Sequence, residues 1–409
     1  MTDELAVYLL GRHTGTLTRG PRGRLSFEYT PQAADDGLEL SPRLPTGHAA
    51  SSRAITSFVA GLLPERPEVR ERWAHDLGTT TSDFDLLTHM GLDCPGAVQF
   101  IAPERSDELE RPETYAPMSE TAFDDRLTEL ADGEPEWTLP GEHWSLDGYQ
   151  DKFAVARLDG QWLTATGSAA TTHIVKPGIR RMRGQALVEH VTMRAAARCG
   201  LAVARTEYVE PGGVGGIVVE RFDRVVTADG VRRWHQVDLC QALGVMPSSK
   251  YEQDGGPSAA DIATLLRPAD VRRLSDALIF NYLSGSNDGH AKNYALLYAA
   301  GQRRLTPLYD VASGLPYGAE AAERTVAMSI GGQRRLGSVG RAEWERHARQ
   351  LHLDPTERVD RVRHLAERLL EAFEAAFDEV AGSLEAATIR SRLLPRLEQH
   401  LGDTLRAVG

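Results

Sequence analysis

The chain has 409 residues, of which 41% are hydrophobic and 25% charged, the composition of an ordinary soluble protein with two or three domains. It has no apolar stretch of about 18 residues, which excludes a transmembrane helix, and its acidic start, Met1–Glu4, lacks the basic region of a signal peptide. Three widely spaced cysteines and a net charge of −12 predict a cytoplasmic protein with free thiols that contacts no membrane and reaches DNA only through a basic partner.

The first hundred residues combine strand and helix patterns. Residues 5–29 predict a β-hairpin, because a short apolar run is followed by a turn region and by apolar residues at a spacing of two. Residues 52–90 predict helices, one of them capped by Ser82, and residues 96–101 predict a further strand. We therefore expect a small α/β domain over residues 1–101.

The middle of the chain changes character twice. Residues 102–140 are rich in Pro, Asp and Glu, which predicts a linker region with one helix near 121–131. Residues 141–235 predict the nucleotide-binding part of an N-terminal lobe. Its expected elements are strands at 151–158, 172–176 and 216–220, and a helix at 184–199 that ends at Gly200.

Residues 236–409 are expected to be mostly helical. The predicted helix at 270–283 gathers its apolar residues on one face, and the helix at 356–380 carries a longer apolar stripe that predicts core packing. The whole order indicates an α+β protein with a bilobal kinase-like fold, a β-rich N-terminal part and a mostly α-helical C-terminal lobe. A nucleotide between the lobes fits this architecture.

Lysine is scarce in this chain. Only four of the 46 basic residues are lysines, at positions 152, 176, 250 and 292. A bias toward arginine would replace any lysine that serves only as a surface charge. The surviving lysines are therefore candidates for sites that need a compact ammonium group.

Two acidic segments in the C-terminal half suggest phosphoryl transfer. Asp288 and Asn293 have the D-x-x-x-x-N spacing of a kinase catalytic loop, and Asp310 ends the strand-like run that follows. Tyr294–Tyr298 and Arg304–Leu308 predict the hairpin that would bring these residues together. Local spacing also allows a polar loop that caps a helix and an aspartate in an ordinary turn.

Three further segments fit a nucleotide site. Lys176 ends an apolar strand, from which its ammonium can reach phosphates, and Glu189 lies on the next helix, placed to pair with it. His173 is expected to be structural. On local grounds the segment 144–152 is an ordinary turn, although backbone N–H groups in such a turn can also bind phosphates. Likewise, Val219–Arg224 is locally a strand end, although its backbone could also act as an adenine hinge.

The joint set of motifs closely resembles the HipA family, the kinase toxins of bacterial type II toxin–antitoxin pairs. The resemblance covers nearly the whole chain. Its motifs are Leu62-Leu63-Pro64, Phe84-Asp85-Leu86-Leu87, Gly96-Ala97-Val98, Ser145…Gly148-x-Gln150-x-Lys152, Thr172-His173-Ile174-x-Lys176, Val219-Glu220-Arg221-Phe222-Asp223-Arg224, Lys250-Tyr251-Glu252-x-Asp254-Gly255-Gly256-Pro257, Asp288-Gly289-His290-Ala291-Lys292-Asn293 and Thr306-Pro307-x-Tyr309-Asp310.

The resemblance implies a role for each matching residue. Asp288 is the implied catalytic base, Asn293 and Asp310 bind Mg²⁺, and Lys176 holds the ATP phosphates. The other implied nucleotide contacts are Asp147, Gly148, Tyr149, Gln150, Asp151 and Lys152 in a phosphate loop, Glu220, Arg221 and Phe222 in an adenine hinge, and His290 and Tyr309 near the catalytic loop.

Ser145 is the implied autophosphorylation site, whose modification expels the loop and silences the kinase. A phosphate carrying a charge of roughly −1.5 to −2 beside the phosphates of ATP would repel them. Asp147 departs from the family, which usually has a small apolar residue there. The extra carboxylate predicts weaker ATP binding unless it points away from the nucleotide.

The resemblance also implies partners. Family members phosphorylate an aminoacyl-tRNA synthetase, and a small helix-turn-helix antitoxin, HipB, neutralises them in a complex that represses the operon. Two other functions are compatible with the same residues. One is a small-molecule phosphotransferase, and the other is a corepressor that acts mainly through its helix-turn-helix partner.

Overall fold

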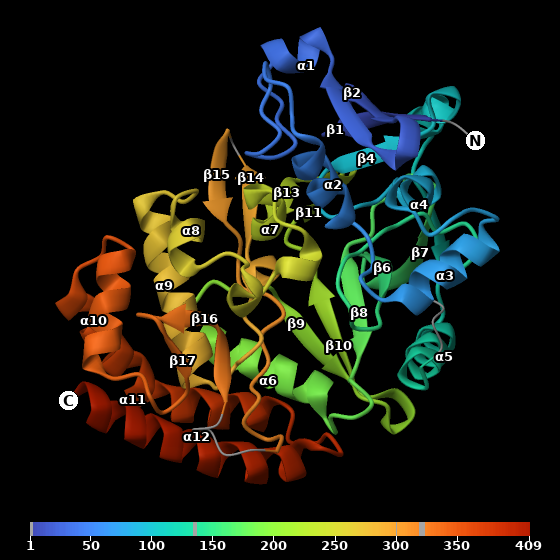
Figure 1. Ribbon diagram of the computed structural model, residues 1–409. Coiled ribbons are helices and arrows are strands. Elements are labelled where there is room, and N and C mark those ends of the chain that lie inside the picture. The colour runs from blue at the N-terminus through green and yellow to red at the C-terminus, as the bar shows by residue number, and fades with distance from the viewer. Residues whose placement is uncertain (1–2, 134–136, 300, 319–323) are drawn as a thin grey trace. The chain divides into compact units, whose positions relative to one another are not determined.

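The computed structural model describes residues 3–133, 137–299, 301–318 and 324–409 (Figure 1). Each of its two compact units is built from separate segments of the chain. Unit 1 comprises Met1–Pro177, Glu220–Ser248 and Ala295–Arg303, and unit 2 comprises Gly178–Val219, Ser249–Tyr294 and Arg304–Gly409. Residues 134–136 of the predicted linker lie outside the described residues. None of the described helices is both long and apolar enough to span a membrane.

Unit 1 begins with a four-stranded antiparallel sheet in the order β3-β2-β1-β4. Its strands are β1 (Glu4–Leu9), β2 (Arg12–Arg19), β3 (Leu25–Tyr29) and β4 (Val98–Ile101). The accompanying helices are α1 (Pro31–Asp35), α2 (Ser52–Ala60), α3 (Pro67–Asp76) and α4 (Asp83–Met90). Helix α4 begins where predicted, because the Ser82 hydroxyl accepts the Asp85 N–H at 3.2 Å.

A second antiparallel sheet in unit 1 carries the predicted phosphate-binding lysine. The order β5-β7-β6-β8 joins β5 (Thr114–Pro117), β6 (Phe153–Leu158), β7 (Gln161–Thr166) and β8 (His173–Pro177), and α5 (Glu120–Ala131) packs on β8. The remaining elements of unit 1 are the hairpin of β11 (Arg224–Thr227) and β12 (Gly230–Arg233), the pair of β13 (His235–Asp238) and β14 (Ala295–Ala299), and α7 (Leu239–Leu243).

Unit 2 is mostly helical. Its helices are α6 (Gln185–Arg198), α8 (Ala259–Ala263), α9 (Pro268–Leu283), α10 (Arg341–Gln350), α11 (Pro355–Glu379) and α12 (Ala386–Val408). Helix α11 packs against α6, α9, α10 and α12, and Figure 1 shows α11 and α12 side by side. The stripe predicted on α11 is confirmed as core, because Val362, Leu365, Leu369, Phe373 and Phe377 are at most 1% exposed.

Unit 2 also contains short strands. Strands β9 (Thr206–Val209) and β10 (Gly216–Glu220) pair, as do β16 (Thr325–Ile330) and β17 (Gln333–Arg335). Of these, β10 confirms the strand predicted at 216–220, and β16 and β17 were not predicted. Strand β15 (Gln302–Leu305) starts and ends earlier than the predicted strand at Arg304–Leu308. Pro307 has no N–H for a ladder, which explains why the strand ends before it.

The mixed fold with helices and sheets confirms the predicted α+β class. Helix α6 ends one residue earlier than predicted and Gly200 follows it with a left-handed φ of +83°. Three of the four lysines, Lys152, Lys176 and Lys292, are at most 8% exposed. Lysine is almost never fully buried without a specific contact, and the role of these lysines in sites that need a compact ammonium group stays a prediction.

Candidate active site

Two of the residues predicted for phosphoryl transfer, Asp288 and Asn293, lie on one loop of unit 2. Helix α9 ends at Leu283, and the chain then passes through Asp288 to the short 3₁₀ turn Ala291–Asn293. The Asn293 amide Nδ2 donates to the backbone carbonyls of Asp288, at 3.1 Å, and Asp310, at 3.3 Å. One buried side chain thus ties the loop to the second acidic segment.

Asp310 has an unusual backbone. Its φ is +58°, a left-handed conformation that non-glycine residues rarely adopt. The preceding segment is fixed, because Leu308 exchanges two backbone hydrogen bonds of 2.8 Å with Ala202 and Ala204. A strained and exposed aspartate after an anchored segment is a typical feature of a functional site.

The donor set suits a hard divalent cation. Asp288 and Asp310 are exposed carboxylates, and both hydrogen bonds from Nδ2 orient the Asn293 amide so that its oxygen can act as a ligand. Within the described ranges no group of three or more His, Cys, Asp or Glu side chains could hold a metal ion. Mg²⁺ commonly binds through one or two protein oxygens together with waters and substrate phosphates, so these residues fit it.

The other residues of the loop support its shape. The Tyr309 hydroxyl donates to the Lys292 carbonyl at 2.7 Å. Burial lowers the pKa of His290 to about 4, although Asp288 acts in the opposite direction, so this imidazole is neutral at physiological pH. Sequence reasoning missed the Tyr251 hydroxyl, which donates to Asp288 Oδ1 at 2.7 Å. Tyr251 belongs to the motif Lys250–Pro257, which the sequence singled out but to which no function was assigned.

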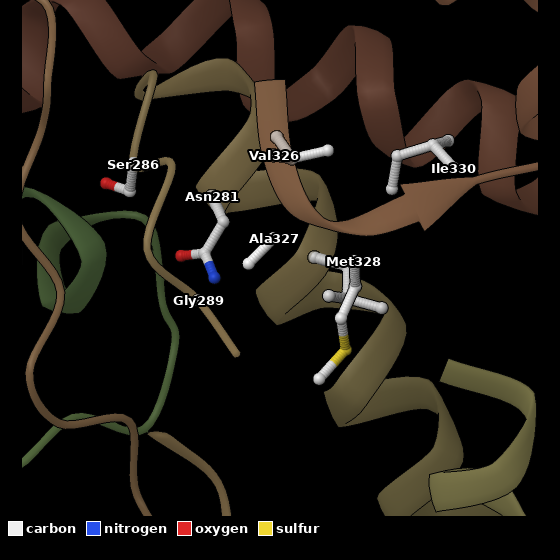
Figure 2. Close-up of a pocket in the computed structure, with 8 residues that line it drawn as sticks. Asn281, Ser286, Gly289, Val326, Ala327, Met328 and Ile330 are labelled. Atoms are coloured by element: carbon white, nitrogen blue, oxygen red, sulfur yellow. The ribbon is translucent and has the colours of Figure 1, made fainter. Parts of the chain in front are cut away.

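Helix α9 packs against the loop that carries Asp288. Asn281, which is 4% exposed, donates from Nδ2 to the Tyr294 hydroxyl at 2.8 Å. Figure 2 shows its amide beside the loop that carries Ser286 and Gly289, with the side chains of β16 nearby. The cavity here, about 10 Å³ in volume, is large enough for no more than one water molecule.

Ser145 is fully buried in unit 1. Its hydroxyl donates to the Leu62 carbonyl at 2.5 Å, and its N–H donates to the Asp93 carbonyl at 3.1 Å. The Glu65 N–H donates to the Gly148 carbonyl at 2.9 Å. The loop from Ser145 to Gly148 is therefore docked against the segment Leu62–Glu65.

The rest of this loop has mixed environments. Tyr149 is 63% exposed, whereas Gln150 donates to the Pro177 carbonyl at 2.8 Å. Asp151 accepts from the Trp137 indole at 2.9 Å and pairs with Arg66, which makes it a structural residue in this conformation. Lys152 donates to the Asp147 carbonyl and lies 4.9 Å from the Trp137 ring centre.

The predicted hinge sits on a buried charge network in unit 1. Arg221 and Arg224 pair with Asp93 at 3.2 and 2.8 Å and also with Asp223, all at most 6% exposed. Burial alone would raise the pKa of Asp93, but Arg224, Arg221 and Arg233 outweigh it and hold that pKa well below its usual range. The Arg221 N–H donates to the Thr172 carbonyl at 2.9 Å, so an adenine contact from this segment would come from Glu220 or Phe222.

The structure thus gathers the predicted residues into two groups. Unit 2 contains Asp288, His290, Asn293, Tyr309 and Asp310, and unit 1 contains Ser145, Asp147–Lys152, Lys176 and Glu220–Phe222. Glu189 is buried in α6 of unit 2, where it accepts from Gln185 at 3.3 Å. Its pairing with Lys176 remains a prediction, as do the roles of the individual site residues.

Comparisons with known proteins give the class and then the family. Residues 144–377 match the family described as HipA-like C-terminal domain, and residues 5–101 match the HipA N-terminal domain. The serine/threonine-protein kinase toxin HipA of Shewanella oneidensis is 28% identical over 430 residues, which cover 93% of this chain and 94% of that one. These matches make the chain a serine/threonine kinase by class.

Two further similarities indicate the family of the chain. A Sinorhizobium fredii protein named Y4mE is 37% identical over 365 residues, 85% of each chain. The solved structure of Shewanella oneidensis HipA with HipB and operator DNA covers 97% of both chains, with 26% identity and a TM-score of 0.80. The chain belongs to the HipA family of kinase toxins.

Proposed function

We propose that this HipA-family kinase uses ATP and Mg²⁺ to phosphorylate serine or threonine on a protein. The observation that carries the proposal is the arrangement of Asp288, Asn293 and Asp310, in which one buried amide holds both acidic segments together. Phosphoryl transfer depends mainly on positioning and charge stabilisation. This arrangement supports a role for Asp288 in positioning the acceptor and for Asn293 and Asp310 in holding the cation that would stabilise the charge.

The proposed reaction uses the chain's residues as follows. Asp288 accepts the proton of the acceptor hydroxyl while the hydroxyl oxygen attacks the γ-phosphorus and the bond to ADP breaks. Asn293 and Asp310 would hold Mg²⁺, which neutralises charge on the phosphates when bound. Lys176 would add a positive charge at the phosphates.

The remaining nucleotide contacts are proposed for unit 1. Asp147, Gly148, Tyr149, Gln150, Asp151 and Lys152 would form the phosphate loop. In the adenine hinge, Glu220 and Phe222 would contact the base, and Arg221 would hold the segment through its bond to Thr172. His290 and Tyr309 would complete the site. The contacts made by Asp151 and Lys152 in the docked loop imply that these two side chains exchange partners when a nucleotide binds.

Ser145 is proposed as the autophosphorylation site. The hydroxyl is 0% exposed and held by Leu62, so a phosphate cannot be added while the loop is docked. Modification therefore requires the loop to leave, and the added charge would oppose its return. A loop with these two states would allow the kinase to silence itself.

A HipB-like helix-turn-helix antitoxin is the proposed partner, and an aminoacyl-tRNA synthetase the proposed substrate. The solved Shewanella complex contains HipA, HipB and operator DNA. A chain with a net charge of −12 would reach DNA through such a partner. The proposed domains are 1–101, the linker region 102–140, the nucleotide-binding part 141–235 and the helical lobe 236–409, in the cytoplasm.

The test is a phosphate map. The chain and its Asp288→Asn variant are each incubated with Mg-ATP and a mixture of purified aminoacyl-tRNA synthetases, and labelled serines are located by mass spectrometry. We expect labelling of Ser145 or a synthetase, reduced about 10³-fold in the variant because a general base contributes up to about 10⁴-fold. Absence of protein labelling by the parent chain, or full activity of Asp288→Asn, would refute the proposal.

A further inference from the structure

We propose that Tyr251 is a positioning residue whose hydroxyl fixes the carboxylate of the catalytic base, Asp288. The inference deepens the proposed function and rests on it. It gives a role to the motif Lys250–Pro257, which the nucleotide and metal assignments leave without one.

The contact is direct. The Tyr251 hydroxyl donates to Asp288 Oδ1 at 2.7 Å, and hydrogen bonds to a charged acceptor are among the stronger ones. Asp288 is exposed on a loop, where a carboxylate can rotate. A bond to Oδ1 restricts that rotation and directs the other oxygen, Oδ2, to the proton of the acceptor hydroxyl.

Tyr251 is itself held rigidly enough for this role. Its carbonyl accepts the N–H groups of Asp254 and Gly256 at 3.0 and 2.9 Å. The turn leaves no room for a side chain at Gly256, because a Cβ there would lie 2.2 Å from the Ser249 carbonyl oxygen. The next residue, Glu252, binds Ser329 through both carboxylate oxygens, one of them 2.7 Å from the Ser329 hydroxyl.

The ring also packs on the catalytic loop. Its centre lies 4.8 Å from that of His290 with the planes at 84°, an edge-to-face contact. The Ala291 N–H donates to the Lys250 carbonyl at 3.4 Å. Two segments far apart in sequence are therefore joined by backbone, ring and hydroxyl contacts, which favours positioning over a hydroxyl that blocks the site and must move away.

Tyr251 takes no part in the bond changes. During transfer, the oxygen–phosphorus bond forms, the bond to ADP breaks, and the proton moves from the acceptor hydroxyl to Asp288. The Tyr251 hydroxyl keeps its own proton and continues to donate a hydrogen bond to Oδ1 throughout the transfer. Removing that donor should therefore slow transfer without weakening ATP binding.

Tyr251→Phe tests this, since phenylalanine keeps the ring on His290 and removes only the hydroxyl. Parent and variant both carry Ser145→Ala, which prevents self-silencing, and the acceptor is either the Asp288→Asn chain or the synthetase labelled in the phosphate map. We expect the single-turnover transfer rate to fall about tenfold, part of the 10²–10⁴-fold that a general base contributes. The KM for ATP and the melting temperature should stay unchanged.

Tyr208→Phe is the matched control, because the Tyr208 hydroxyl also donates to a carboxylate, that of Glu210 at 2.9 Å, elsewhere in unit 2. This control should transfer phosphate at the parent rate. An unchanged or faster rate in Tyr251→Phe, or a loss confined to KM, would overturn the positioning role while leaving the proposed function intact. A parent that labels no protein would overturn both.

Discussion

At the scale of single residues, the burial of Ser145 has a measurable consequence. Ser145→Ala removes the hydrogen bond to Leu62 and leaves that carbonyl unsatisfied, which should lower the free energy of unfolding by about 1–3 kcal/mol. Ser145→Glu places an unpaired charge in the same buried position and should cost several kcal/mol, roughly 3–5. Urea unfolding of the two variants measures both effects.

Ser391 provides the comparison for Ser145. Its hydroxyl also donates to a backbone carbonyl, that of Thr388 at 2.9 Å, but the side chain is exposed. Ser391→Ala and Ser391→Glu should therefore unfold like the parent chain. If Ser145→Glu proves as stable as Ser145→Ala, the docked loop contributes nothing to stability, and the argument for self-silencing from its burial fails.

The sequence predicted site residues whose spacing is local and missed those whose contacts are distant. Asp288 and Asn293 are five positions apart, so their motif was readable. Tyr251 and Asp288 are 37 positions apart, and the Asn281 side chain is bonded to Tyr294, 13 positions away, and lies against Gly289. Such contacts depend on how helices and loops pack, which residue spacing does not encode.

At the scale of elements, Gly289 links the catalytic loop to helix α9. A Cβ at this position would lie 2.4 Å from Asn281 Nδ2 (Figure 2), and Asn281 is itself buried and bonded to Tyr294. Gly289→Ala should displace the loop, slow phosphate transfer at least about tenfold and destabilise unit 2 by about 1–3 kcal/mol. Transfer assays and thermal unfolding measure the two effects.

Two further variants isolate the clash. Gly382→Ala should be neutral, because an added Cβ there meets nothing within 4 Å. Asn281→Ala removes the clashing amide, so the double variant should lose less activity than the two single losses combined. Simple additivity in this cycle would show that Gly289 acts through something other than Asn281.

Elements were predictable where local chemistry defines their ends. Ser82 caps α4, and Asp354 accepts the Glu357 N–H at 2.8 Å at the start of α11. Strands were predicted less well. Strands β16 and β17 are short, and their pairing depends on tertiary contacts more than on propensity.

At the scale of the whole molecule, the chain crosses between its units repeatedly, which no composition shift in the sequence indicated. Segments 220–248 and 295–303 return to unit 1. The buried network of Asp93, Arg221 and Arg224 holds the first of these segments within that unit. Charges from distant segments can be buried together only when they pair, and such pairing is invisible in a linear sequence.

The buried histidines predict that acid weakens unit 2 before unit 1. Among the described residues, burial lowers the pKa to about 4 for His190, His290 and His347 in unit 2, and for His235 in unit 1. The unfolded chain, with a histidine pKa near 6.5, takes up these protons first. Stability present above pH 6.5 is therefore lost as pH falls toward 4, by up to about 1.4 kcal/mol per pH unit for each histidine.

Hydrogen exchange measured by peptide at several pH values, corrected for intrinsic rates, should show α6, α9 and α11 losing protection between pH 6.5 and 4 before β1 and β6 do. Carboxylates such as Asp93 contribute only below their usual pKa of 3.8, so they act in a separate window. His347→Gln should reduce the loss of protection in unit 2, whereas His75→Gln, at an exposed position, should not.

Equal loss of protection in both units would contradict the buried-histidine explanation. Three of the four histidines whose pKa is lowered to about 4 lie in unit 2, so unit 2 should respond first.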